Sequence, residues 1–182
     1  CSHIVPCDAN GVAVKSLSLP TGMYLVDAIV VDDGFYTQTT DSAIMPVYDP
    51  EGGFATGGGW IEVAGADGSV EKSNIGFNVR YKNDEATGNV EFHYYAGGIK
   101  LKGTDIEWLV IGPTSAQFQG TGTIKDMPGT FTFRITCIDK KAAENANTLT
   151  VRIWEGSNTA AQPVFEAVNH LLGGGSISVK AE

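Results

Sequence analysis

The stretch "GGFATGGGWIEV", from Gly52 to Val63, places five glycines within eight residues directly before a tryptophan and an alternation of apolar and polar residues. That alternation predicts a β-strand with one buried face. Glycines ahead of a strand permit a sharp reversal, because glycine adopts positive φ angles without a Cβ clash. They also let another segment lie close to the backbone, and we expect one beneath the Trp60 ring. A second run, Gly173–Gly175, precedes the last predicted strand, so we expect the two runs to meet at one corner.

Period-two alternation recurs from Gly58 to the end of the chain and predicts about ten short strands with Phe77, Phe92 and Phe133 facing inward. Strands without helices between them imply antiparallel pairing. One short helix is predicted near the C-terminus, from Val164 to Leu172, after Pro163. We therefore expect an all-β fold: an antiparallel two-sheet sandwich of the jelly-roll type with this one helix.

The chain divides into two parts. Residues 1–46 contain apolar strands such as "MYLVDAIVV" (Met23–Val31), followed by a turn at Asp32–Gly34. About 48 residues with two or three strands are near the limit of independent stability. We interpret residues 1–46 as the remnant or extension of an immunoglobulin-like module that packs on the rest, and residues 47–182 as the sandwich domain.

The composition limits the class of partner. The chain has 182 residues, 42% of them hydrophobic, and a formal net charge of −9. Such acidity argues against nucleic acid as a partner, because its phosphates would be repelled. No apolar run reaches the roughly 18 residues that a membrane helix needs. The acidity indicates either solubility or the binding of a hard cation such as calcium, and both interpretations remain open.

Calcium prefers carboxylate and carbonyl oxygens, and acidic residues gather in predicted turns and after one strand. Aspartate also favours turns because it bonds its own backbone, so the pattern has a purely structural alternative. The candidate calcium ligands are Asp32, Asp33, Asp49, Glu51 and Asp139.

The three cysteines do not form a zinc motif, since no CxxC pair is present. Cys1 and Cys7 are close enough in sequence to form a disulfide. Cys137 falls on an inward-facing position and is predicted to be a buried, unreactive thiol. A chain that begins at cysteine fits either a processed secreted lipoprotein, anchored through Cys1, or an arbitrary boundary.

Several segments resemble, in order, the bacterial post-COAP family domain. They are "VYDPEGGFATGGGWIEV", "GFNVRYK", "GNVEFHYY", "WLVIG", "AQFQGTGTI", "FTFRITCID" and "LTVRIWEG". The resemblance covers about Val47 to Val179, with Asn147 near a place where family members carry an acidic residue. It implies a C-terminal module of a secreted or surface bacterial protein that follows PKD-like or immunoglobulin-like repeats. It brings no catalytic residues.

A polar outer face is the candidate binding surface. Arginine, glutamate and aromatic side chains on a sheet can bind sugars through stacking and bidentate hydrogen bonds. The alternative is a ladder of solvated cross-strand pairs. If their strands share one sheet, the residues on its wet side are Arg80, Glu91, His93, Tyr95, Arg134, Arg152 and Trp154.

Catalysis is not expected from this sequence. No G-x-S-x-G motif is present, and nothing determines the separation of Glu91 and Glu107, two carboxylates on predicted strands. We therefore expect a non-catalytic extracellular module with a structural or adhesive role, whose partners are other extracellular modules or surface glycans. A carbohydrate-binding module is the alternative, and a glycosidase is a third, weaker one.

Overall fold

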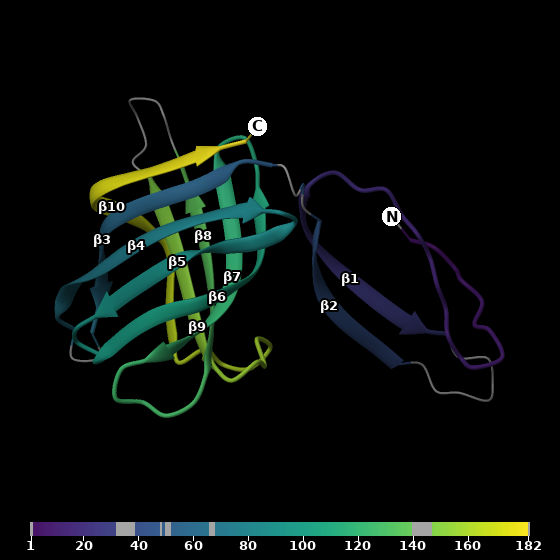
Figure 1. Cartoon of the computed structure of the whole chain (residues 1–182). Coiled ribbons are helices and arrows are strands. Elements are labelled where there is room, and N and C mark those ends of the chain that lie inside the picture. The colour runs from purple at the N-terminus through teal and green to yellow at the C-terminus, as the bar shows by residue number, and fades with distance from the viewer. Residues whose placement is uncertain are drawn as a thin grey trace.

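The computed structural model describes residues 2–31, 39–47, 49, 52–65, 68–139 and 147–181. The regular structure in these ranges consists entirely of β-strands, which confirms the all-β class (Figure 1). The strands are β1 (Gly22–Val30), β2 (Thr39–Val47), β3 (Phe54–Ala64), β4 (Val70–Lys82), β5 (Glu85–Tyr94), β6 (Ile99–Ile111), β7 (Ser115–Ile124), β8 (Phe131–Ile138), β9 (Thr148–Glu155) and β10 (Phe165–Lys180).

Strands β3 to β10 form one closed antiparallel barrel. Each strand pairs with the next along the chain, and β10 returns to pair with β3. The expected two-sheet sandwich of the jelly-roll type is therefore wrong. Alternating burial could not distinguish the two folds, because a sandwich and a barrel both bury every second side chain. The pairing of the last strand with the first decides between them.

The helix expected over Val164–Leu172 is also wrong, because most of these residues belong to β10. Phe165 and Ala167 point into the barrel and are 6% and 2% exposed. A register shift between Ala167 and His170, with Asn169 at a φ of 55°, marks a β-bulge. The bulge interrupts the period of two, and Val164, Val168 and Leu171 are apolar although they are 50%, 45% and 61% exposed, so the apolar residues of this segment do not follow strand alternation.

The two glycine runs meet as expected, but not at a corner ahead of the strands, because they lie inside β3 and β10 where these two strands pair. Gly175 lies opposite Gly59 in the register. The φ of Gly175 is 95°, and a Cβ there would collide with the Gly58 carbonyl oxygen. A Cβ on Gly173 would overlap the Trp60 ring, so the missing side chain lets the indole lie against the β10 backbone. Glycine at this seam is what allows the barrel to close.

Side chains from opposite walls meet in the centre of the barrel. The ring centroids of Phe77 on β4 and Phe118 on β7 are 5.3 Å apart, and those of Phe92 on β5 and Phe165 on β10 are 4.9 Å apart. Each pair joins strands three places apart in the closed order, so the contacts cross the barrel. Phe77, Phe92 and Phe133 are 5%, 0% and 0% exposed, which confirms their predicted burial. Because apolar side chains occupy the centre, the outer wall is the surface on which to look for binding.

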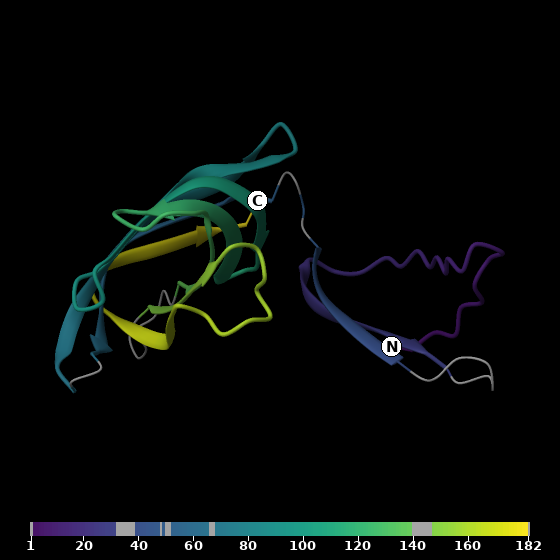
Figure 2. The same ribbon diagram turned by 90° about the horizontal axis from the view of Figure 1, so that it is seen from below.

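Strands β1 and β2 form a separate two-stranded sheet beside the barrel (Figures 1 and 2). Both strands contact β6. Leu25 and Ile29 of this hairpin are 68% and 55% exposed. A two-stranded sheet is marginally stable in water, so we expect the hairpin to open more readily than the barrel.

We expect Gly175→Ala to lower the free energy of unfolding by about 2–4 kcal/mol, because alanine is strained at positive φ and its Cβ meets the neighbouring strand. The matched control is Gly76→Ala, since nothing lies within 4 Å of the position that a Cβ on Gly76 would take. Denaturant unfolding followed by tryptophan fluorescence measures both effects. Equal stability of the two variants would contradict the proposed closure of the barrel.

Burial raises the pKa of the Cys137 thiol to about 12, whereas Cys7 is exposed. The thiolate is the nucleophile, so at about pH 8 we expect iodoacetamide to alkylate Cys7 and to spare Cys137 in the native protein. Denaturant should make Cys137 react as an exposed thiol does. Peptide mass spectrometry after timed alkylation reads out both sites, and rapid native labelling of Cys137 would refute its burial.

Candidate functional site

The seven residues expected on one binding face lie on two different parts of the barrel wall. One group belongs to β4, β5 and the turn after β5: Arg80, Glu91, His93 and Tyr95. The other belongs to β8 and β9: Arg134, Arg152 and Trp154. In the closed order, β6 and β7 separate the groups on one side, and β10 and β3 separate them on the other. The structure therefore brings His93 and Tyr95 together, and Arg134 together with Arg152 and Trp154, whereas Arg80 lies opposite Thr87 near the other end of β5.

The first group forms a ladder of solvated side chains. Tyr95 is 55% exposed, and its hydroxyl accepts a hydrogen bond from Asn74 Nδ2 at 3.3 Å. The His93 ring meets the Tyr95 ring edge-on, with centroids 6.1 Å apart. Glu91 lies opposite Gly76 on one side and Lys102 on the other. Such cross-strand contacts contribute about 0.2–1 kcal/mol each to sheet stability and need no ligand to explain them.

The second group is part of a row of polar side chains across the other wall. Gln119 on β7 lies opposite Arg134 on β8, Arg134 opposite Arg152 on β9, and Arg152 opposite Glu166 on β10. Glu107 on β6 extends the row, because its Oε2 accepts a hydrogen bond from Gln119 Nε2 at 2.8 Å. We call these five residues the wall row.

Hydrogen bonds connect the wall row at both ends. Arg134 donates from Nε and Nη2 to Gln119 Oε1 at 2.9 and 2.7 Å. Arg152 forms a hydrogen-bonded ion pair with Glu166. Carboxylates thus stand at the two ends and guanidinium groups in the middle, so the formal charges of the row cancel.

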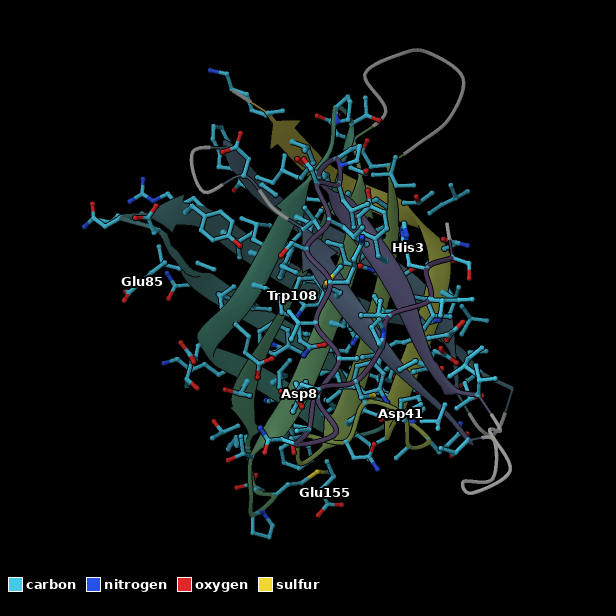
Figure 3. The ribbon with its side chains drawn as sticks, turned by 90° about the vertical axis from the view of Figure 1, so that its right-hand side faces the viewer. His3, Asp8, Asp41, Glu85, Trp108 and Glu155 are labelled. Atoms are coloured by element: carbon cyan, nitrogen blue, oxygen red, sulfur yellow. The ribbon has the colours of Figure 1, made fainter. Side chains whose placement is uncertain are left out.

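Two tryptophans hold Arg134 in place. Its Cζ lies 5.7 Å from the centroid of the Trp108 ring and 5.4 Å from that of the Trp154 ring, within the range of cation–π attraction. Trp154 is only 3% exposed, and its Nε1 donates to the Ala161 carbonyl at 3.0 Å. Trp108 is half-buried, on the side of the barrel toward the hairpin (Figure 3). Trp154 is therefore a covered support, and Trp108 is the more exposed of the two rings.

The electrostatics of the wall row favour an incoming acceptor. Burial lowers the pKa of Arg134, the positive charge of Arg152 lowers it further, and Glu107 raises it. Like charges directly opposite each other on a sheet repel. Arg134 bonds to Gln119 and Arg152 bonds to Glu166, each on the side that faces away from the other arginine. Oxygen acceptors of a ligand placed between the two guanidinium groups would relieve their repulsion.

The sequence-based prediction missed Trp108, Gln119 and Glu166 and considered Glu107 only as one of two carboxylates for hydrolysis. Glu166 was hidden by its assignment to a helix. A register shift between Ile106 and Trp108 obscured which residues of β6 face outward. Gln119 could have been found by matching outward positions across the β7–β8 hairpin.

Asp32, Asp33 and Glu51, three of the five candidate calcium ligands, lie outside the described ranges, so the structure does not test them. Cys1 also lies outside these ranges. Asp49 is exposed. Asp139 is 5% exposed, and its Oδ2 accepts a hydrogen bond from the Val179 N–H at 3.0 Å, which ties the end of β8 to β10.

Within the described part of the chain, no group of three or more His, Cys, Asp or Glu side chains could hold a metal ion. Calcium binding stays a prediction.

No family model matches the chain, and no curated protein or solved structure matches it either. The resemblance of Val47–Val179 to the post-COAP domain therefore also stays a prediction. Among the residues that the structure describes, no helix is long and apolar enough to cross a membrane.

We expect Gln119→Leu to lower the free energy of unfolding by about 1.5–3 kcal/mol, because it removes the acceptor of a charged, half-buried guanidinium. Gln117 on the same strand offers a matched control, since its Nε2 donates to the neutral Thr136 hydroxyl at 2.6 Å. Gln117→Leu should cost about 0.5–1.5 kcal/mol. Denaturant titration compares the two, and a larger loss for Gln117→Leu would contradict the importance of the Arg134 contact.

Proposed function

We propose that the chain is a non-catalytic extracellular or cell-surface module with a structural and adhesive role, and that the wall row is its adhesive surface. The single observation that carries the proposal is the set of contacts that Arg134, at the centre of a charge-balanced row, makes with Trp108, Trp154 and Gln119. A binding group already fixed by its neighbours loses little further freedom when a ligand arrives.

The chemistry of the row suits saccharides. Sugar hydroxyls both donate and accept hydrogen bonds, and the row offers arginine donors beside carboxylate and amide acceptors. The half-buried Trp108 supplies an apolar ring next to them, as saccharide sites combine aromatic surface with a few oriented polar groups. This supports the carbohydrate-binding alternative as the mechanism of adhesion.

Charge favours neutral over acidic saccharides. The formal net charge of the chain is −9, so an acidic polysaccharide would be repelled at long range. The row itself carries no net formal charge and offers no local excess of positive charge to offset that repulsion.

The two carboxylates of the wall row are too far apart to act together in glycoside hydrolysis. Glu107 on β6 and Glu166 on β10 are separated by four strand spacings. At about 4.8 Å per spacing the two carboxylates stand roughly 15–20 Å apart along the wall. Glycosidases place their two carboxyl groups about 5–10 Å apart, on either side of the scissile bond.

We expect the protein to be retarded by neutral but not acidic polysaccharides in affinity electrophoresis. Arg152→Leu should weaken this retardation at least about tenfold, because it removes central donors of the row. Arg80→Leu is the matched control, since Arg80 is an exposed arginine on the opposite wall. Circular dichroism confirms that both variants are folded. Retardation unchanged by Arg152→Leu, or no retardation by any neutral polysaccharide, would overturn the proposal.

A further inference from the structure

A second feature of the outer wall lies at the seam between β10 and β3 and shares no residue with the wall row. It is an open depression of about 470 Å³, floored by Trp60 and lined by Glu62, Val168, His170 and Leu171. The β10 bulge shapes its far side, and the Asn169 N–H pins that bulge by donating to Thr150 Oγ1 at 2.9 Å. The depression is thus built by the backbone of the seam.

The ammonium group of Lys72 already lies over the face of the Trp60 ring. Gly173 leaves room for the indole on the β10 backbone, and Lys72 Nζ lies 3.9 Å from the ring centroid. An ammonium group at this distance is attracted by the negative face of the ring. The position over Trp60 therefore fits an ammonium group in both size and charge.

Glu62 is available at the edge of the depression. It lies directly opposite Lys72 in the β3–β4 register and is exposed. Across the described ranges the ion pairs are Lys125–Asp126 and Arg152–Glu166, so Lys72 rests on the indole and does not pair with Glu62. A second cation entering the depression would find Glu62 without a salt bridge to any described residue.

We propose that the depression binds an organic cation, an alkylammonium group on an aliphatic stem, which replaces Lys72 Nζ over Trp60. Its charge pairs with Glu62, and its stem lies along Val168 and Leu171, which are 45% and 61% exposed. The formal net charge of −9 attracts cations to this surface. The same charge and the Glu62 carboxylate disfavour anions. The site uses none of the wall-row residues, so it stands independently of saccharide binding.

The test is a titration with n-butylammonium in which the Trp60 indole N–H signal is followed in ¹H–¹⁵N spectra. The signal is assigned by its loss in the Trp60→Phe variant. We expect a saturable shift of this signal. Lys72→Met should tighten binding about fivefold, because the resident ammonium no longer competes for the ring. Glu62→Gln should weaken it by about the same factor. Exposed residues on other strands provide the matched controls, Lys100→Met and Glu91→Gln, which should change nothing.

Two further ligands define what is recognised. A lysine-containing peptide with blocked termini presents the ammonium group on a protein side chain, whereas n-butylammonium presents it on a free amine. Equal binding of the two supports recognition of the ammonium group and its aliphatic stem. The neutral n-butylacetamide should not bind. Equal binding of the amide and the amine, no shift of the Trp60 signal, or no tightening in Lys72→Met would overturn the proposal. Saccharide retardation of Lys72→Met should match the unsubstituted protein, so the two sites can fail separately.

Discussion

The pairing of β10 with β3 is the constraint on which the rest of this structure depends. Seven of the eight barrel interfaces join strands that are consecutive in sequence, and this one joins the ends of the barrel segment. It brings the backbones together so closely that a Cβ on Gly175 would strike the Gly58 carbonyl. Trp60 then lies over Gly173 where β10 shifts register. The glycine-rich stretch before Trp60 therefore serves closure of the barrel.

Closure determines where binding can occur. Aromatic side chains cross the barrel and meet, as Phe77 does with Phe118, so the interior is a core. The outer wall carries both candidate sites, and the seam shapes one of them directly, because the Trp60 floor and the β10 bulge belong to it. The wall row does not involve that seam, because its Arg152–Glu166 pair joins β9 and β10, which are consecutive in sequence.

The sequence predicted the parts of this fold that depend on local pattern. Strand positions, the inward phenylalanines, the buried Cys137 and the meeting of the glycine runs all follow from alternation and from the lack of a glycine Cβ. Closure could not be predicted, because the choice between barrel and sandwich lies in strand partners far apart in sequence. The helix was predicted wrongly because a bulge at Asn169 interrupts the alternation and because exposed apolar residues such as Val168 and Leu171 lie on both sides of it.

The candidate site was predictable only in part, for a related reason. Arg134, Arg152 and Trp154 were identified as outward-facing residues of neighbouring strands, and they do lie together. Residues such as His93 and Tyr95 share the outward orientation but lie on another part of the wall. Outward alternation shows which side of a strand a residue occupies. It does not show how far round a curved wall that residue lies.

The most direct test of barrel closure is a nuclear Overhauser measurement across the seam. If β10 pairs with β3 as described, the Gly173 Hα protons will show contacts to the Trp60 indole and a ring-current shift that disappears in Trp60→Leu. The Hα protons of Gly175 and Gly59 will also show a cross-strand contact. Random-coil shifts for Gly173, together with no contact between the two glycine runs, would mean an open sheet and would contradict the account.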